Sequence, residues 1–76
     1  MPKLPRMNGK EMVKALTRAG FFVHHQTGSH VHLRHTQVLH LRVTIPCHTS
    51  FNLPLFVIKS ILKQAELPLR DFLKLL

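Results

Sequence analysis

The spacing of apolar residues changes abruptly at Gly20, and no other feature constrains the fold of this chain as tightly. Before Gly20 the apolar residues recur every three or four positions, as they do along one face of an amphipathic helix. After Gly20 they alternate with polar residues, which is typical of strands with one buried face. A later segment returns to helical spacing. Because 76 residues are enough for only one hydrophobic core, we expect a single α+β domain over residues 1–76.

The first helix is predicted to begin after Asn8 and to end before Gly20. Asn8 is a favoured N-cap residue, and Glu11 three positions later completes a capping box. Residues 1–7 contain two prolines and are predicted to form a flexible N-terminal arm. The buried stripe of this helix consists of Met12, Val13, Leu16 and Ala19.

Three short strands are predicted to follow, over Phe21–His25, His30–His35 and Leu39–Ile45. In the second and third, apolar residues alternate with His, Arg and Thr, so one face is buried and the other meets solvent. The register of the first strand stays open, because Phe21 and Phe22 cannot both face the core. The solvent face collects His30, His32, Arg34, His40, Arg42 and Thr44.

Helical spacing returns after Pro54, and Pro68 separates this helix from a short one over Leu69–Leu76. The stripe of the longer helix is Ile58, Ile61, Leu62 and Ala65. The predicted architecture is therefore α-β-β-β-α with a short extra C-terminal helix. We expect the three strands to form one antiparallel sheet that carries its helices on one face.

The chain is strongly basic, with eleven Lys and Arg against three Asp and Glu and a formal charge of +8. This imbalance indicates a polyanionic partner, which is a nucleic acid, an acidic protein or an anionic lipid surface. The single cysteine, Cys47, excludes an internal disulfide framework and a Cys-rich zinc module, and it fits a reducing cytosol. No apolar run is long enough to cross a membrane and no signal peptide is recognisable. We therefore expect a cytoplasmic protein without a membrane partner.

Seven histidines give the chain a possible chemistry. Imidazole takes and gives protons near neutral pH, and RNA cleavage by its own 2′-OH needs such a group together with cations. Because the nucleophile comes with the substrate, no deep pocket is required. His30, His32 and His40 beside Arg34 and Arg42 fit this chemistry. Two alternatives stay open: ordinary solvent-exposed strand histidines, or a zinc site made by the three histidines.

A turn over Thr27–Ser29 immediately precedes His30. Gly28 permits a positive φ or a close approach of the backbone to a phosphate, and Ser29 offers a hydroxyl. A hairpin corner would need Gly28 for its geometry alone, so the turn is compatible with either role.

Four segments, taken together in order and spacing, resemble one protein family. They are Ala19-Gly20-Phe21, Thr27-Gly28-Ser29-His30, Val43-Thr44-Ile45-Pro46-Cys47-His48, and Leu53-Pro54 leading into Ile58–Leu67. From Asn8 onward the chain resembles the HicA (YcfA-like) mRNA interferase toxins of bacterial HicA–HicB toxin–antitoxin systems. The resemblance implies a fold like the double-stranded-RNA-binding domain and a metal-independent RNA endonuclease that needs no cofactor and acts on mRNA. It also implies one catalytic histidine, here His30, and a HicB antitoxin that covers the active surface.

Further substrate contacts are nominated from the turn, strand parity and charge rather than from the family: Gly28, Ser29, His32, Arg34, Arg42 and His48. Two other functions remain open, a non-catalytic RNA-binding module of the same fold and an adaptor whose basic face binds an acidic protein.

The chain departs from the family pattern at three places. Phe56 and Val57 are bulky where the family has small residues, and we expect them to reshape the surface beside the sheet. Glu66 replaces a glycine that ends the helix, and the connection Thr36–Val38 lacks the usual Asp-Gly. The catalytic element itself is intact.

Overall fold

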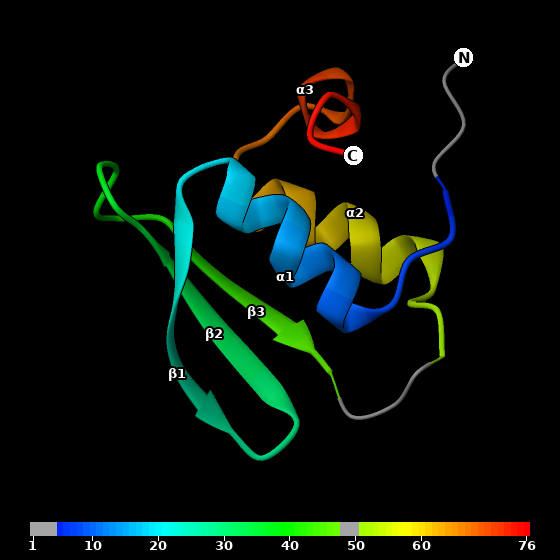
Figure 1. Ribbon diagram of the computed structural model, residues 1–76, viewed down its shortest axis with the longest axis horizontal. Helices are drawn as coiled ribbons and strands as arrows, with labels where there is room; N and C mark the ends of the chain where they lie inside the picture. Colours follow the sequence, from blue (N-terminus) through cyan, green and yellow to red (C-terminus); the bar gives the residue numbers. More distant parts are fainter. Residues whose placement is uncertain (1–4, 48–50) are drawn as a thin grey trace.

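The structure is a computed structural model that describes residues 5–47 and 51–76 (Figure 1). Its elements are α1 (Gly9–Arg18), β1 (Phe21–Thr27), β2 (His30–His35), β3 (Arg42–Pro46), α2 (Leu55–Gln64) and α3 (Leu69–Leu73). The strands form one antiparallel sheet in the order β1-β2-β3. The predicted α-β-β-β-α fold with an extra C-terminal helix is therefore confirmed.

The start of α1 is fixed by the predicted capping box. The Glu11 amide donates to Asn8 Oδ1 at 2.9 Å, and the Asn8 amide donates to Glu11 Oε1 at 3.0 Å. Met7 and Met12 flank this box and are both buried, as in a hydrophobic staple. The predicted arm over residues 1–7 lies partly outside the described residues. At its inner end Met7 already belongs to the core, whereas Pro5 and Arg6 are exposed.

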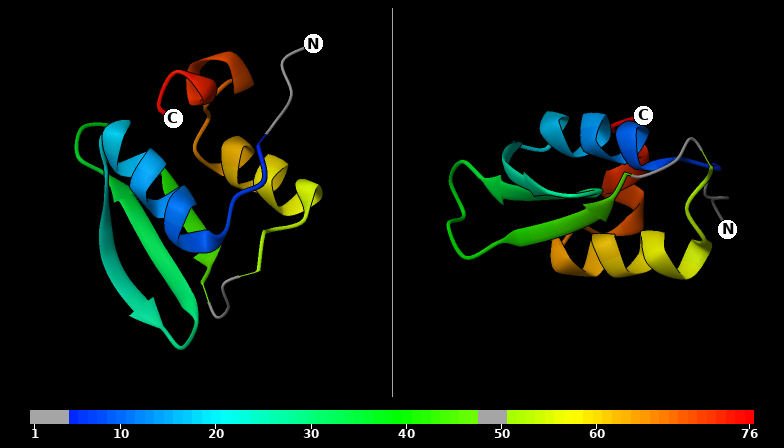
Figure 2. Two further views of the ribbon diagram at one scale, coloured as in Figure 1. Left: turned by 45° about the vertical axis from the view of Figure 1, so that its right-hand side comes forward. Right: turned by 90° about the horizontal axis from the view of Figure 1, so that it is seen from below.

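One face of the sheet packs against the helices, and Figure 2 shows α1 and α2 beside the sheet. The inward residues of the strands and the apolar stripes of the helices form one core. α3 closes one end of the helical layer (Figures 1 and 2), and its Phe72 is fully buried. The largest fully buried side chains are Phe72, Met12, Leu16, Leu33, Ile45, Ile61 and Val43.

The alternation predicted for the strands decides which side chains face the helices. Val31 and Leu33 of β2 lie opposite Ile45 and Val43 of β3, and all four are buried. In β1 Phe21 is buried while Phe22 is 41% exposed, which settles the register that the sequence left open. The register shifts between Val23 and His25, so His24 forms a bulge in β1.

Two strand boundaries differ from the prediction by two residues or more, and the end of β3 differs by one. β3 begins at Arg42 rather than Leu39, because the Leu41 amide donates to the Val38 carbonyl in a turn, and Leu39 is 76% exposed. His40 lies in this turn and does not reach the sheet face. β1 continues to Thr27, since the turn after it has only two residues and the ladder persists up to the Thr27–His30 pair.

His35, at the end of β2, joins the sheet to the end of α1. Its Nδ1 accepts from the amides of Gln37 and Val38 at 3.1 and 3.0 Å, so the ring proton sits on Nε2 and is donated to the Ala19 carbonyl at 3.0 Å. Gly20 follows with φ of +99°, and a Cβ there would lie 2.7 Å from His35 Nε2. Both the backbone conformation and the space therefore require glycine at this position.

Glu66 ends α2 in the manner of the family's glycine. Its φ is +52°, its amide donates to the Lys63 carbonyl, and the Leu67 amide donates to the Leu62 carbonyl, which is a Schellman arrangement. The departure at Glu66 thus preserves the helix end. At the other departure from the family pattern, the bulky pair, Phe56 is 73% exposed and Val57 packs against the core. No helix within the described parts of the chain is long and apolar enough to cross a membrane.

Candidate active site on the uncovered face of the sheet

We call the side of the sheet that faces away from the helices the outer face. It consists of alternate residues of the three strands, and the register aligns them in rows across the sheet. The three rows are Thr27, His30 and Pro46; His25, His32 and Thr44; and Phe22, Arg34 and Arg42. The face is therefore rich in imidazole and cationic groups. All three acidic residues lie elsewhere, in α1, after α2 and in α3.

His30 stands at one end of this face, directly after the turn between β1 and β2. Gly28 is the first central residue of this two-residue turn and has φ of +58°, while Ser29 has a negative φ, as in a type II′ hairpin. The Gln26 side-chain amide donates to the Gly28 carbonyl at 2.9 Å, and the Cys47 amide donates to the Ser29 carbonyl at 2.7 Å. These two hydrogen bonds hold the turn from both sides and fix the position of the backbone from which the His30 side chain projects.

The ring of His30 is open to a ligand. The side chain is exposed, and across residues 5–47 and 51–76 the structure gives its ring no hydrogen-bond partner. Both ring nitrogens are therefore available for proton transfer with a bound molecule. This is the setting expected of a general base or acid before its substrate arrives.

His32, two residues further along β2, is held from both neighbouring strands. Its ring stacks on that of His25 in β1, with centroids 4.3 Å apart and an interplanar angle of 11°. Its Nδ1 lies 3.2 Å from Thr44 Oγ1 in β3. His25 in turn places its Nδ1 2.8 Å from His24 Nδ1. The sequence pattern placed His32 and Thr44 on this face but missed His25, which reaches it only because of the bulge at His24.

Thr44 is itself positioned by α2. Its amide, on the free edge of β3, donates to Gln64 Oε1 at 3.0 Å, and the Gln64 amide group donates to Ser60 Oγ at 3.3 Å. Ser60 and Gln64 belong to the segment that contributed to the family resemblance, and here they tie the helix to the middle row of the outer face. The sequence pattern of this segment does not reveal that role.

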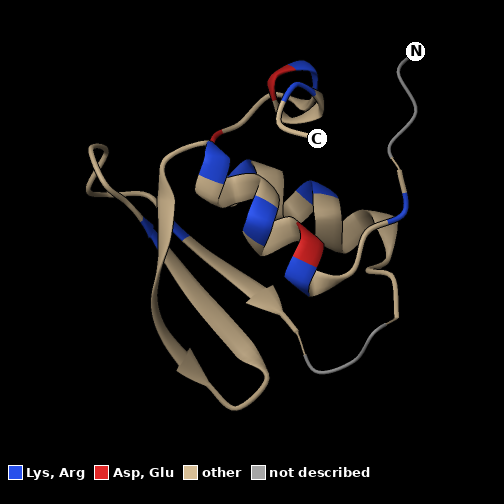
Figure 3. Cartoon of the chain, viewed as in Figure 1, with Lys and Arg blue, Asp and Glu red and all other residues tan. Residues whose placement is uncertain are grey.

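Arg34 and Arg42 are paired in the sheet, at the end of the face remote from His30. Arg34 lies four positions after His30 in extended chain, a span of about 13 Å. The two arginines therefore do not lie beside the atoms that His30 reaches, and they suit a phosphate further along a bound strand. Figure 3 shows the other Lys and Arg mainly on the helices.

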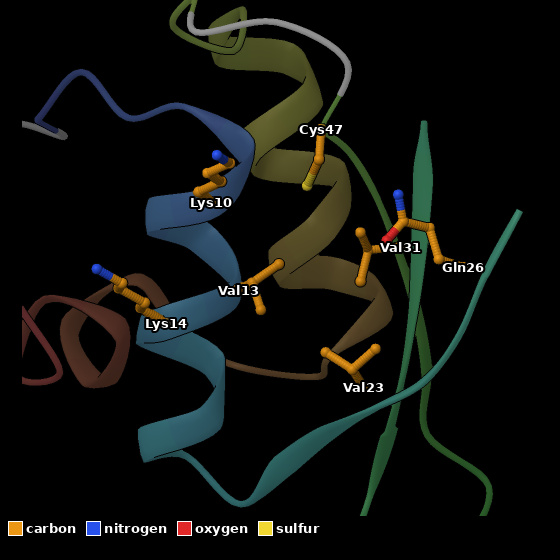
Figure 4. A pocket seen from close by; sticks show the side chains of 7 residues that line it. All are labelled: Lys10, Val13, Lys14, Val23, Gln26, Val31 and Cys47. Atoms are coloured by element: carbon orange, nitrogen blue, oxygen red, sulfur yellow. The ribbon is translucent and has the colours of Figure 1, made fainter. Parts of the chain in front are cut away.

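A groove lies on the helix side of the same hairpin, between α1 and the ends of β1 and β2 (Figure 4). Its volume is about 360 Å³, and its lining is mostly apolar. Burial raises the pKa of the Cys47 thiol at its edge, and the nearby Lys10 ammonium opposes that shift. The lining residues are Lys10, Val13, Lys14, Val23, Gln26, Val31 and Cys47.

One of the predicted histidines, His40, does not join this arrangement. His40 Nε2 lies 3.0 Å from Glu66 Oε2, away from the outer face, so the three-histidine set with His30 and His32 does not form. His48 lies outside the described residues. Within the described ranges no three His, Cys, Asp or Glu side chains come together as potential metal ligands.

The fold and this face define a small, basic α-β-β-β-α domain with an exposed histidine beside a tight hairpin turn. Residues 9–67 match the HicA toxin family of bacterial toxin–antitoxin systems. Because this match covers most of the 76-residue chain, the protein belongs to the HicA toxin family, and membership implies a cognate antitoxin. No curated protein sequence matches the chain.

Proposed function

We propose that this toxin is a metal-independent endonuclease that cleaves mRNA, with His30 as its catalytic residue. The observation that carries the proposal is the setting of His30. It lies in the Gly-Ser-His element of a HicA family member, on a hairpin turn fixed by two hydrogen bonds, with an exposed ring that bonds to nothing else in the described residues. The net charge of +8 supports an RNA substrate.

The chemistry needs little from the protein beyond this face. His30 takes the proton of a ribose 2′-OH, and the oxygen attacks the adjacent phosphorus, so the substrate supplies its own nucleophile. An uncovered sheet face is sufficient because a flexible RNA strand can lie along it. Gly28 and Ser29 bring the backbone close to the strand at the point of cleavage.

The other nominated residues contact the RNA at different places along the outer face. Arg34 and Arg42 hold a phosphate next to the cleaved nucleotide rather than the one that reacts, because of their distance from His30. His32 lies between the two positions. We keep His48 as a substrate contact on the grounds of its place after β3.

The cognate partner in this proposal is a HicB-type antitoxin that covers the outer face in the cytoplasm. Such a protein would need acidic groups opposite Arg34 and Arg42, because the face has no carboxylate of its own.

Cleavage of a long single-stranded RNA in excess EDTA tests the proposal. The full chain is compared with His30→Ala and with a matched control, His40→Ala, which removes an exposed imidazole away from the outer face. We expect the full chain and His40→Ala to cleave the RNA and His30→Ala to be inactive, with all three melting at similar temperatures. Equal cleavage by His30→Ala would assign the activity to another residue or to a contaminant.

The same samples separate the alternatives. If the full chain shifts RNA on a gel with a strong salt dependence but never cleaves it, the protein is a non-catalytic RNA-binding module. If it has no affinity for RNA and forms a stoichiometric complex with an acidic protein that survives RNase treatment, it is an adaptor.

A further inference from the structure

The middle row of the outer face contains a second imidazole that is better organised than His30. His32 is half-buried, stacked on His25 at 4.3 Å and joined to Thr44 at 3.2 Å. A strand histidine that only faces solvent is not expected to make these contacts with both neighbouring strands. The arrangement fixes the plane of the ring and which nitrogen is engaged, which is how proton-transfer histidines are oriented.

We propose that His32, oriented by His25 and Thr44, is the second proton-transfer group of this site and protonates the leaving 5′ oxygen. The proposal rests on RNA cleavage at His30. His30 accepts the 2′-OH proton as the P–O2′ bond forms. The P–O5′ bond breaks with its electron pair on O5′, and His32 Nε2–H supplies the proton to that oxygen. The products are a 2′,3′-cyclic phosphate and a 5′-hydroxyl end.

Within the described residues no hydrogen bond engages Nε2 of His32, so the required atom is free. In the proposed scheme Thr44 Oγ1 accepts from Nδ1–H, which leaves Nε2 as the atom that gives and regains the proton. Stacking covers the face of the ring and leaves its edge open. The parallel His25 ring, with its centroid 4.3 Å away, holds the plane of the His32 ring.

The spacing also suits two groups that act on opposite sides of one phosphate. His30 and His32 are two residues apart on the same face of β2, which separates their Cα atoms by about 6.7 Å. In this scheme each reacting oxygen is hydrogen-bonded to its own histidine. Arg34 is one step further along the strand, where it contacts the neighbouring phosphate.

A substrate with a 5′-bridging sulfur distinguishes a proton donor from a binding residue, because a thiolate leaves without being protonated. The full chain, His30→Ala, His32→Ala and the control His40→Ala are assayed on the oxygen and sulfur forms of one dinucleotide. We expect His32→Ala to lose about 10²-fold or more on the oxygen form and to recover most of that on the sulfur form. His30→Ala should lose activity on both, and His40→Ala on neither.

Two other outcomes are decisive. An equal loss by His32→Ala on both substrates, or no loss on either, would overturn the role of His32 while leaving cleavage at His30 in place. Failure of the full chain on both substrates would overturn the proposed function, and the inference with it.

The pH dependence gives an independent readout. The groups facing His32 are His25 of β1, His30 and Arg34 of β2, and Thr44 and Arg42 of β3, with no carboxylate among them. We expect the alkaline limb of the pH–rate profile, which reports loss of the acid's proton, to disappear in His32→Ala. An unchanged profile contradicts the proposal.

Thr44 is a positioning residue in this scheme, because it acts through His32. Thr44→Val removes the hydroxyl and keeps the shape, so we expect a smaller loss on the oxygen substrate than in His32→Ala. Thr44→Ser should restore the rate, and failure of this rescue would count against the hydrogen bond to Nδ1.

Discussion

The two ends of β2 carry the same residue in opposite circumstances. His35, at the anchored end, is half-buried, makes three hydrogen bonds and meets Phe21 edge-on with ring centroids 4.9 Å apart. His30, at the open end, is exposed, and in the described parts of the chain its ring bonds to nothing. The strand separates them by five positions, an odd number, so they face opposite sides of the sheet.

This difference shows what decides the role of a histidine in so small a domain. A ring whose two nitrogens are both engaged by the backbone, as in His35, is fixed in its tautomer and orientation and has no nitrogen left for a ligand. The ring of His30, on the outer face, makes no hydrogen bond within the described residues and keeps both nitrogens available. The anchored end, with Gly20, His35 and Glu66, therefore contributes stability, and the open end, with Gly28, His30 and Cys47, holds the histidine that we propose to be catalytic.

The largest effects should come from replacing each of the two histidines in turn by alanine. We expect His30→Ala to lower the cleavage rate by about 10² to 10⁴-fold and to change the free energy of unfolding by less than about 0.5 kcal/mol. His35→Ala should do the reverse, costing about 2 kcal/mol of stability while the rate per folded molecule is retained. Urea unfolding and single-turnover cleavage measure the two quantities separately.

The contrast between the two histidines would be contradicted if either substitution changed both the cleavage rate and the free energy of unfolding. A large loss of stability in His30→Ala would make it a structural histidine like His35. Lost cleavage by fully folded His35→Ala would show that the anchored end contributes to the chemistry.

Gly20→Ala should cost more stability than His35→Ala, about 3 kcal/mol in the free energy of unfolding. Part of this comes from forcing a residue with a Cβ to a φ of +99°, and part from displacing His35, whose Nε2 would lie 2.7 Å from that Cβ. In a His35→Ala background only the backbone cost remains, about 1 to 2 kcal/mol. A double-mutant cycle measures the difference, and equal costs in both backgrounds would show that His35 is not displaced.

Much of this division could be predicted from the sequence, because strand parity needs only local information. The alternation correctly placed Val31, Leu33, Val43 and Ile45 toward the core. The capping box predicted the start of α1, and the helical stripes predicted which faces of α1 and α2 are buried. The likeness to the family singled out His30, whose catalytic role stays a prediction.

The parts that were missed depend on contacts between distant residues. His40 was placed on the outer face, whereas a turn at Val38–Leu41 shortens β3 and sends His40 to Glu66. The stacking of His25 on His32 follows from a bulge that no periodicity reveals. The bond from Gln64 to the Thr44 amide spans 20 positions and exists only because α2 lies along the edge of β3.

A smaller and opposite effect is expected at the other left-handed residue of the anchored end. Glu66→Gly relieves a φ of +52°, worth about 1 to 2 kcal/mol, and the gain is offset by the flexibility of glycine in the unfolded chain. It also removes the exposed contact with His40, which contributes at most about 1 kcal/mol. We expect a net stabilisation below about 1 kcal/mol by urea unfolding. Glu66→Gln keeps the backbone strain and loses only the charge, so it should not be more stable than the unaltered chain.

The smallest effect lies at the open end, in the titration of Cys47. Desolvation raises the pKa of the thiol and Lys10 opposes the rise, so the folded-state pKa lies above that of the unfolded chain. The neutral thiol therefore contributes stability that is fully present below the unfolded pKa and is lost as the pH rises through the folded one. Alkylation by iodoacetamide requires the thiolate, so its rate should rise at a higher pH in the folded protein than in urea.

Lys10→Met should move the alkylation curve of the folded protein to still higher pH. Lys14→Met, which lines the same groove but does not perturb the thiol, should leave the curve in place. Identical curves for the folded protein and its Lys10→Met variant would show that the ammonium exerts no field at this edge of the groove, and that burial alone sets the reactivity of Cys47.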